Sequence, residues 1–208
     1  RMGQKIISLM TTLMPAGVLY EVDTRLRPNG ASGMMVTDFE SYKSYIENKA
    51  WNWEHQAFTR VRAVVGDAQS RQAFDDFKHH FLTQSRDIET VKADVVEMRQ
   101  KMADSLDKSN DTQFDLKQGQ GGIVDIEFMV QYLVLAFANQ YPSLVEYSDN
   151  VRILEAVKQA GLLTFEQADA LTHAYKTYRS KYHRVALQNE KAIVEPGCYL
   201  AERESVKT

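Results

Sequence analysis

The chain has 208 residues, of which 44% are hydrophobic and 25% charged, and its formal net charge is -3. That length and composition suffice for one good hydrophobic core, or for a core with a small appendage. The pI near 6.0 excludes a strongly cationic nucleic-acid-binding protein, although a local basic patch stays possible.

Cysteine content and hydropathy indicate the compartment. The single cysteine, Cys198, can form no internal disulfide, which is typical of a reducing cytosol. The longest apolar run, residues 123–138, is interrupted by Asp125, Glu127 and Gln131 and is too short to span a bilayer. We therefore expect a cytoplasmic protein that binds neither nucleic acid nor membrane.

The first part of the chain reads as a helix followed by a hairpin. Helical spacing of apolar residues from Ile6 onward ends at the sequence MPAG, residues 14–17. Alternation then predicts a strand at 18–27, a turn at PNGASG and a short returning strand at 34–36.

After residue 36 almost every signal is helical. Asp or Thr at the expected N-caps and Gly at several expected ends divide this part into helices with short connections. The helices are expected at residues 37–50, 51–66, 67–84, 87–107, 123–139, 149–161 and 164–188, with a further helix at 201–208 and a polar loop at 109–122.

These elements predict a mainly α protein, a helical-bundle domain preceded by a short β-hairpin. We place the boundary between residues 1–36 and 37–208. Because helical rhythm is already present at the first residues and again at the last, we expect the chain to be a piece of a longer protein.

The predicted strand at 18–27 gathers charge on one face. Counting by two, Glu21, Asp23, Arg25 and Arg27 lie on one side, and the other side is largely apolar. A carboxylate between arginines stays ionised at neutral pH and suits a hard cation such as Mg²⁺, so Asp23 and Glu21 are the candidate metal ligands. The arginines are then left for phosphate oxygens. The alternative is a solvated edge strand with cross-strand ion pairs.

The segment WNWEHQAFTRVRAVVG contributes aromatic residues and two arginines. Trp51, Trp53 and Phe58 are expected in the core rather than as a ligand platform. Arg60 and Arg62 diverge by about 200° on a helix, so both reach one pocket only if the helix ends between them.

A glycine-rich loop precedes the apolar helix at 123–139. Its N–H groups would suit an anion, but a plain helix entrance is at least as good an interpretation. Asp125 lies in the first helical turn, where the helix dipole favours a negative charge.

Glu127 is the more demanding carboxylate of this helix. It shares a face with Gln131, four residues on, in otherwise apolar surroundings. Because an unpaired buried carboxylate is costly, it needs a cation, a metal or a hydrogen-bond donor. We expect an arginine partner, with Arg25, Arg60 and Arg62 as candidates, and either a general-base or a purely structural role.

Four stretches carry a resemblance to a known family. The sequences GVLYEVDTRLRPNGASGMMVT, AWNWEHQAFTRVRAVVGD, GGIVDIEFMVQYLVL and SDNVRILE together resemble the C-terminal, adenylylating half of the bifunctional glutamine synthetase adenylyltransferases/deadenylylases. The similarity covers nearly the whole chain in the same order.

The resemblance implies a nucleotidyltransferase fold followed by a helical domain, so that residues 1–36 would be the end of a truncated catalytic domain. It implies AMP transfer from ATP to a tyrosine of glutamine synthetase, with Mg²⁺ as cofactor and with glutamine and the PII signalling protein as regulators. Asp23 matches the family's third metal-binding carboxylate, and Arg60 and Arg62 join the strand arginines as candidates for phosphate binding.

One departure from the family matters. The Asp-x-Asp pair that completes such a metal site does not occur before Asp23. Without it a two-metal transfer loses most of its metal clamp, so we expect the chain alone to be inactive. The competing hypothesis is a helical regulatory module that binds glutamine synthetase or the PII protein.

Overall fold

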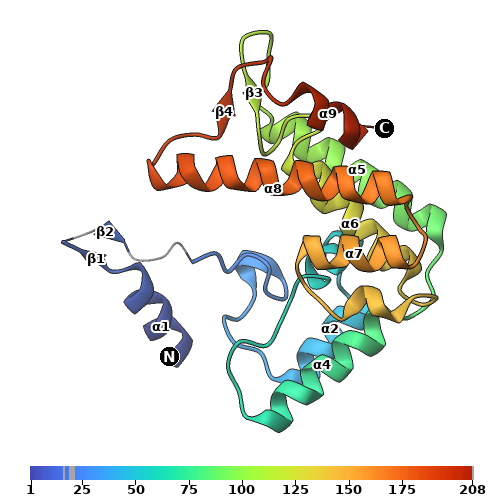
Figure 1. The fold of residues 1–208 in the computed structure, drawn as a ribbon. Helices are drawn as coiled ribbons and strands as arrows, with labels where there is room; N and C mark the ends of the chain where they lie inside the picture. The colour runs from blue at the N-terminus through green and yellow to red at the C-terminus, as the bar shows by residue number, and fades with distance from the viewer. Residues whose placement is uncertain (16, 19–21, 208) are drawn as a thin grey trace. The chain divides into compact units, whose positions relative to one another are not determined.

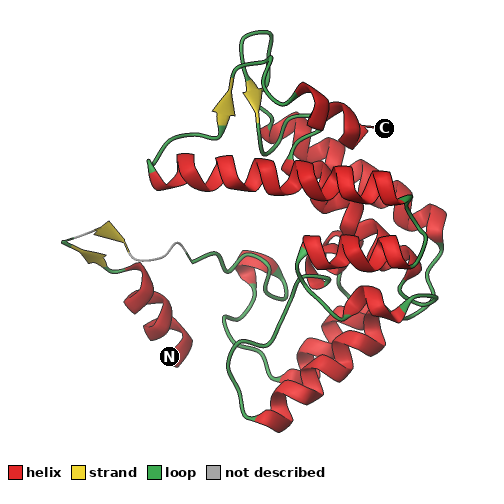
Figure 2. Cartoon of the chain, viewed as in Figure 1, coloured by secondary structure: helices red, strands yellow, loops and turns green. Residues whose placement is uncertain are grey.

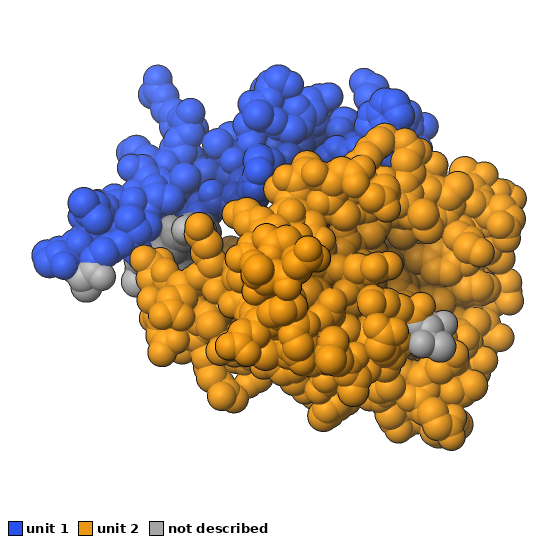
Figure 3. All heavy atoms as spheres, turned by 90° about the horizontal axis from the view of Figure 1, so that it is seen from above, with its two compact units in different colours: residues 1–55 blue, residues 56–208 orange. Residues whose placement is uncertain are grey.

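The computed structural model describes residues 1–15, 17–18 and 22–207. It divides into two compact units, Arg1–His55 and Gln56–Thr208, which are coloured separately in Figure 3. Over the described residues the fold comprises nine α-helices and two short antiparallel strand pairs (Figure 2). The predicted mainly α class, with a small hairpin ahead of the helical domain, is confirmed.

The first unit begins with helix α1 and a tight hairpin. Strand β1 pairs antiparallel with β2, so that Leu13 faces Val18 and Met14 faces Gly17. A short 3-10 helix, η1, and two α-helices follow. The elements are α1 (Met2–Thr11), β1 (Leu13–Met14), β2 (Gly17–Val18), η1 (Gly30–Ser32), α2 (Phe39–Asn48) and the start of α3 (Asn52–Phe58).

The hairpin lies earlier in the chain than expected. The strands predicted at 18–27 and 34–36 are wrong for the described residues 22–27 and 34–36, which form no strand. Turn hydrogen bonds replace them, because the Arg27 carbonyl accepts from the Gly30 N–H at 2.8 Å. The Arg27 guanidinium also donates to three backbone carbonyls, those of Thr24, Ala31 and Gly33.

The second unit is a helical bundle with α6 at its centre. Helix α6 contacts α5, α7, α8 and the 3-10 helix η2, and α9 packs back on α8 (Figure 1). The elements are α4 (Ala68–Leu82), α5 (Ile88–Leu106), β3 (Phe114–Asp115), α6 (Ile123–Phe137), η2 (Pro142–Val145), α7 (Asn150–Gln159), α8 (Phe165–Leu187), β4 (Ile193–Val194) and α9 (Leu200–Lys207).

Side-chain caps set the starts of five helices, where the sequence placed them. Asp38, Asp67, Asp87 and Asp149 each accept a hydrogen bond from the backbone N–H three residues on. Thr164 forms a full capping box at the start of α8. Each cap satisfies a backbone donor that the first helical turn leaves without a partner.

Helix α3 is shorter than expected. The predicted helix at 51–66 ends at Phe58, and turn bonds replace it from Thr59 onward. Phe58 is buried, as expected, against three phenylalanine rings of α4. The expectation that Trp51 and Trp53 belong to the core is wrong, because 72% and 37% of their surfaces, respectively, are exposed.

Two further features complete the fold. Strands β3 and β4 pair antiparallel, although their segments lie almost 80 residues apart and the first was expected to be a polar loop. No helix among the described residues is both long and apolar enough to cross a membrane.

Candidate functional site

The charged segment of the first unit holds a compact, solvent-exposed ion pair. Asp23 accepts from the Arg25 backbone N–H at 2.8 Å and from Arg25 Nη2 at 2.7 Å. These hydrogen bonds with Arg25 lower the pKa of Asp23 to about 2, so the carboxylate is ionised at neutral pH, as the sequence indicated. The side chains of Arg25 and Asp23 are 83% and 55% exposed, so both are accessible to a ligand.

The remaining members of this charged row differ in availability. Arg27 is committed to the loop carbonyls described above, which makes it a clamp of the turn. Glu21 lies outside the described residues. Only one of the two predicted metal-binding carboxylates, Asp23, is therefore described.

A metal centre needs more than this one carboxylate. Within the described part of the chain, no group of three or more His, Cys, Asp or Glu side chains could hold a metal ion. Asp23 fits Mg²⁺ as a single hard oxygen ligand. One carboxylate fills only part of the coordination sphere of Mg²⁺, which in proteins usually also includes waters and substrate phosphates.

The second unit contains Glu127, the carboxylate for which the sequence predicted a partner. Glu127 Oε1 accepts from Arg60 Nη1 at 3.1 Å and from the Tyr175 hydroxyl at 3.2 Å. The Glu127 side chain is 20% exposed and that of Arg60 is 37% exposed. Of the three candidate arginines, Arg60 is the partner, so the predicted pairing of Glu127 is confirmed.

Tyr175 supplies the second hydrogen bond from helix α8. Burial raises the pKa of its hydroxyl, and the nearby Glu127 carboxylate raises it further. Tyr175 therefore stays protonated and keeps donating to the carboxylate. Glu127 thereby holds together α6, α8 and the turn after α3.

The same face of α6 makes a neutral contact one turn further on. Gln56 Nε2 donates to Gln131 Oε1 at 3.2 Å, so Glu127 and Gln131 both meet the end of α3. Helix α3 ends at Phe58, before both arginines of the turn, yet the two do not share a partner in the described residues. Arg60 turns to Glu127, whereas Arg62 is exposed.

The glycine loop before α6 is a helix entrance. Gly121 donates to the Asp125 carboxylate at 2.6 Å, and the next three backbone N–H groups donate to carbonyls of residues 116–119. Donors that an anion would need are thus already occupied. Gly121 has a φ of +82°, and a Cβ there would lie 2.7 Å from the Arg203 carbonyl oxygen, so this site requires glycine.

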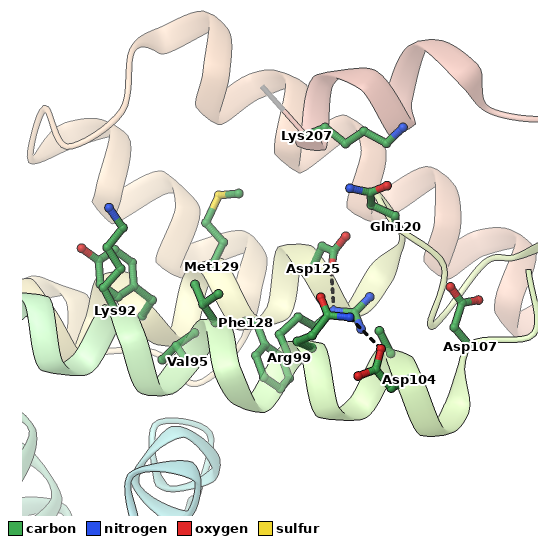
Figure 4. Close-up of a pocket in the computed structure, with 14 residues that line it drawn as sticks. Lys92, Val95, Arg99, Asp104, Asp107, Gln120, Asp125, Phe128, Met129 and Lys207 are labelled. Carbon is green, nitrogen blue, oxygen red and sulfur yellow. Dashed lines mark hydrogen bonds and ion pairs between the residues drawn. The ribbon is translucent and has the colours of Figure 1, made fainter.

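Asp125 does more than cap the helix. Its Oδ1 is ion-paired with Arg99 of α5, and Arg99 Nη2 also donates to the Gln118 carbonyl at 2.7 Å. The pair lies in a groove of about 920 Å³ that is lined mainly by residues of α5 and α6, among them Val95 and Phe128 (Figure 4).

Sequence reasoning did not identify Arg99 and Tyr175 as partners. Arg99 lies 26 residues from Asp125, and Tyr175 lies 48 residues from Glu127. Each occupies a helix rich in other polar residues, so no local pattern distinguishes it. The sequence showed that Glu127 needs a partner, but which residues supply the contacts depends on the tertiary structure.

Comparison with known proteins identifies the family. Residues 1–77 match the glutamate-ammonia ligase adenylyltransferase family, and residues 89–193 match the GlnD PII-uridylyltransferase family. A bifunctional glutamine synthetase adenylyltransferase/adenylyl-removing enzyme of Nitrosococcus oceani is 48% identical over 207 residues, which cover 100% of this chain and 21% of that protein. An enzyme of the same name from Acinetobacter baylyi is 49% identical over 210 residues, which cover 99% of this chain and 23% of that protein.

Half of the chain, residues 89–193, belongs to the GlnD PII-uridylyltransferase domain family. Over its whole length the chain is homologous to bifunctional glutamine synthetase adenylyltransferases/adenylyl-removing enzymes. It spans about a fifth of the length of these two relatives. The ion pair between Arg60 and Glu127 links the two matched regions, since Arg60 lies in the first and Glu127 in the second.

The hydroxyl of Tyr175 provides a test of this cluster. Tyr175→Phe should lower the free energy of unfolding by about 1 kcal/mol at neutral pH, because Glu127 loses a hydrogen bond. The folded-state pKa of Tyr175 is raised, so its contribution is fully present below the unfolded value near 10 and is lost as pH rises through the folded value. The difference between parent and variant, measured by urea unfolding, should therefore narrow above about pH 10.

Tyr147→Phe is the matched control, because Tyr147 is 42% exposed. This variant should leave the free energy of unfolding nearly unchanged, both at neutral pH and above about pH 10. Equal stability of Tyr175→Phe and the parent at neutral pH would contradict the assigned hydrogen bond.

Proposed function

We propose that this chain is part of a cytoplasmic enzyme that transfers AMP from ATP to a tyrosine hydroxyl of glutamine synthetase and thereby regulates nitrogen assimilation. The observation that carries the proposal is the match along the whole chain to two enzymes named for adenylylation of glutamine synthetase and its removal. Assignment to the adenylylating half rests on the tryptophan-containing stretch at residues 51–57.

The proposed reaction is a displacement at phosphorus. The tyrosine oxygen forms a bond to the α-phosphorus, the α–β anhydride bond breaks, pyrophosphate leaves and the tyrosine proton passes to a base. When bound, Mg²⁺ would neutralise charge on the phosphates, with Asp23 as one of its ligands. Asp23 suits this role because it is ionised and exposed.

The arginines divide into two groups in this proposal. Arg25 and Arg62 are exposed and are the better candidates for phosphate oxygens. Arg25 also has a protein acceptor, Asp23, but this pair is largely exposed. Phosphate binding by Arg27 or Arg60 would have to compete with less exposed contacts. Glutamine and the PII protein are proposed as the regulators of the complete enzyme.

Asp23→Asn in the complete enzyme tests the metal-ligand role. Adenylylation should fall by at least about 100-fold, because even outer-shell partners of a metal are worth about 10- to 100-fold. The measurement is transfer of radiolabel from ATP to glutamine synthetase. Asp76→Asn, on the exposed surface of α4, should retain parental activity. Near-parental turnover of Asp23→Asn would refute the role.

The 208-residue chain alone should neither hydrolyse ATP nor transfer AMP from it. Within its described part, Asp23 has no cluster of further carboxylates to complete a metal clamp. A radiolabelled-ATP assay with purified glutamine synthetase measures this, with the complete enzyme as positive control. Transfer above the no-enzyme background would show that the chain carries a sufficient set of ligands.

Glu127→Gln separates a general base from a structural ion pair. The hydrogen bonds that Glu127 accepts from Arg60 and Tyr175 both use Oε1, and these contacts favour the structural role. A structural pair predicts a lower Tm, with activity of the complete enzyme falling only in step with unfolding. A catalytic base predicts lost turnover in a protein that still melts near the parental temperature. We expect the first outcome.

A second candidate function is a binding module for glutamine synthetase or the PII protein. It is favoured by the groove between α5 and α6, whose lining combines apolar side chains such as Phe128 with charged ones such as Lys92 and Asp104 (Figure 4). Binding of this chain to each purified partner distinguishes the candidates. A module should bind one of them without ATP, and substitution of Phe128 in the groove should weaken that binding.

A further inference from the structure

The turn after α3 carries both arginines of the tryptophan-containing segment and is fixed from several sides. Phe58, the last residue of α3, is packed in the phenylalanine cluster of α4. Thr59 Oγ1 donates to the Gln56 carbonyl at 2.7 Å, and Val61 N donates to the Phe58 carbonyl at 3.2 Å. This turn is therefore an ordered part of the second unit.

Lys78 of α4 provides an unusual support for this turn. It is only 8% exposed, and its Nζ donates to the Val61 carbonyl at 2.8 Å. Burial lowers the pKa of this ammonium group, and the Asp75 carboxylate only partly opposes the effect. An apolar side chain of similar length would avoid this desolvation cost, so the hydrogen bond to the turn is the compensating contact.

The acceptor of Lys78 lies between the two arginines. Val61 separates Arg60, which binds Glu127, from Arg62, which is exposed. A shift of the Val61 carbonyl would move both neighbouring residues, because consecutive Cα atoms are fixed at about 3.8 Å. The lysine thus acts on the arginines through the backbone rather than by direct contact.

We propose that Lys78 is a positioning residue, which holds the Val61 carbonyl so that Arg60 meets Glu127 while Arg62 stays available to an anionic substrate. The proposal that Lys78 positions Arg60 against Glu127 rests only on contacts within this unit. The part that concerns substrate rests on the proposed function, with the triphosphate of ATP as the anion.

The first test is a thermodynamic cycle in this 208-residue chain. Tm is measured for the parent, Lys78→Met, Glu127→Gln and the double variant. If Lys78 positions Arg60, the Tm shift caused by Glu127→Gln should be at least twofold smaller in the Lys78→Met background. Equal shifts in both backgrounds, as expected for a general loss of stability, would overturn the proposal.

The second test uses the complete enzyme and ATP kinetics. Lys78→Met should lower kcat/KM for ATP by about tenfold, because a small misplacement of a substrate-positioning group is costly. Lys176→Met, at an exposed position of α8, is the matched control. It should change neither the Tm shift caused by Glu127→Gln nor kcat/KM for ATP. If Lys78→Met reduces the Tm shift caused by Glu127→Gln but leaves kcat/KM for ATP unchanged, Lys78 positions the turn. The same result would refute the role of the turn's arginines in ATP binding.

Failure of Lys78→Met to fold would not end the test. The cycle is then run with Lys78→Gln, whose donor is one bond shorter and cannot reach the Val61 carbonyl. A Tm shift from Glu127→Gln as large as in the parent overturns the proposal, and a shift at least twofold smaller supports it.

Discussion

The central constraint on the helical unit is the need to satisfy Glu127 on an apolar helix. Eight side chains of α6 are buried, and an unpaired carboxylate among them would cost several kcal/mol. Arg60 and Tyr175 provide the compensation from two other segments. The carboxylate is therefore satisfied only when the turn after α3 and helix α8 are both in their native places.

A second carboxylate of α6, Asp125, fixes the rotation of the helix about its axis. Asp125 and Glu127 are two residues apart and so diverge by about 200° around α6. Asp125 pairs with Arg99 of α5, whereas Glu127 pairs with Arg60 and Tyr175. Rotation of α6 about its axis, or a slip along it, would break both sets of contacts together. Buried ion pairs add little net stability, but here they select one rotation of α6.

The helices of this protein were largely predictable, because their start signals are local. Asp87 and Thr164 bond to backbone N–H groups three residues away, and that spacing can be read from the sequence. The strand expected at 18–27 does not form in the described residues 22–27. Whether a strand forms depends on a partner segment to pair with, and the sequence does not show that partner. Alternation alone suggested the strand, and in the described residues the Arg27 guanidinium instead holds the chain in a turn.

The candidate site shows the same division between local and distant information. That Glu127 needs a cation follows from its apolar neighbours, and Arg60 was among the candidates. The choice of Arg60 depends on the turn that follows α3, and this turn begins next to Phe58, whose ring packs in the aromatic cluster of α4. Tyr175 and Lys78 act across 48 and 17 residues, respectively. No spacing rule connects such pairs, so only the three-dimensional fold reveals them.

Exposure separates the charged residues that can exchange partners from those that cannot. The Asp23–Arg25 pair is largely exposed, and exposed pairs contribute little to stability, so a cation or phosphate can replace either partner with little loss. Glu127 is largely buried, and removal of Arg60 from it would leave an uncompensated charge. Within each unit, the exposed charged side chains exchange partners most easily: Asp23 and Arg25 in the first unit, and Arg62 in the second. The cluster around Glu127 is better suited to hold the turn that carries Arg62 than to exchange its own partners.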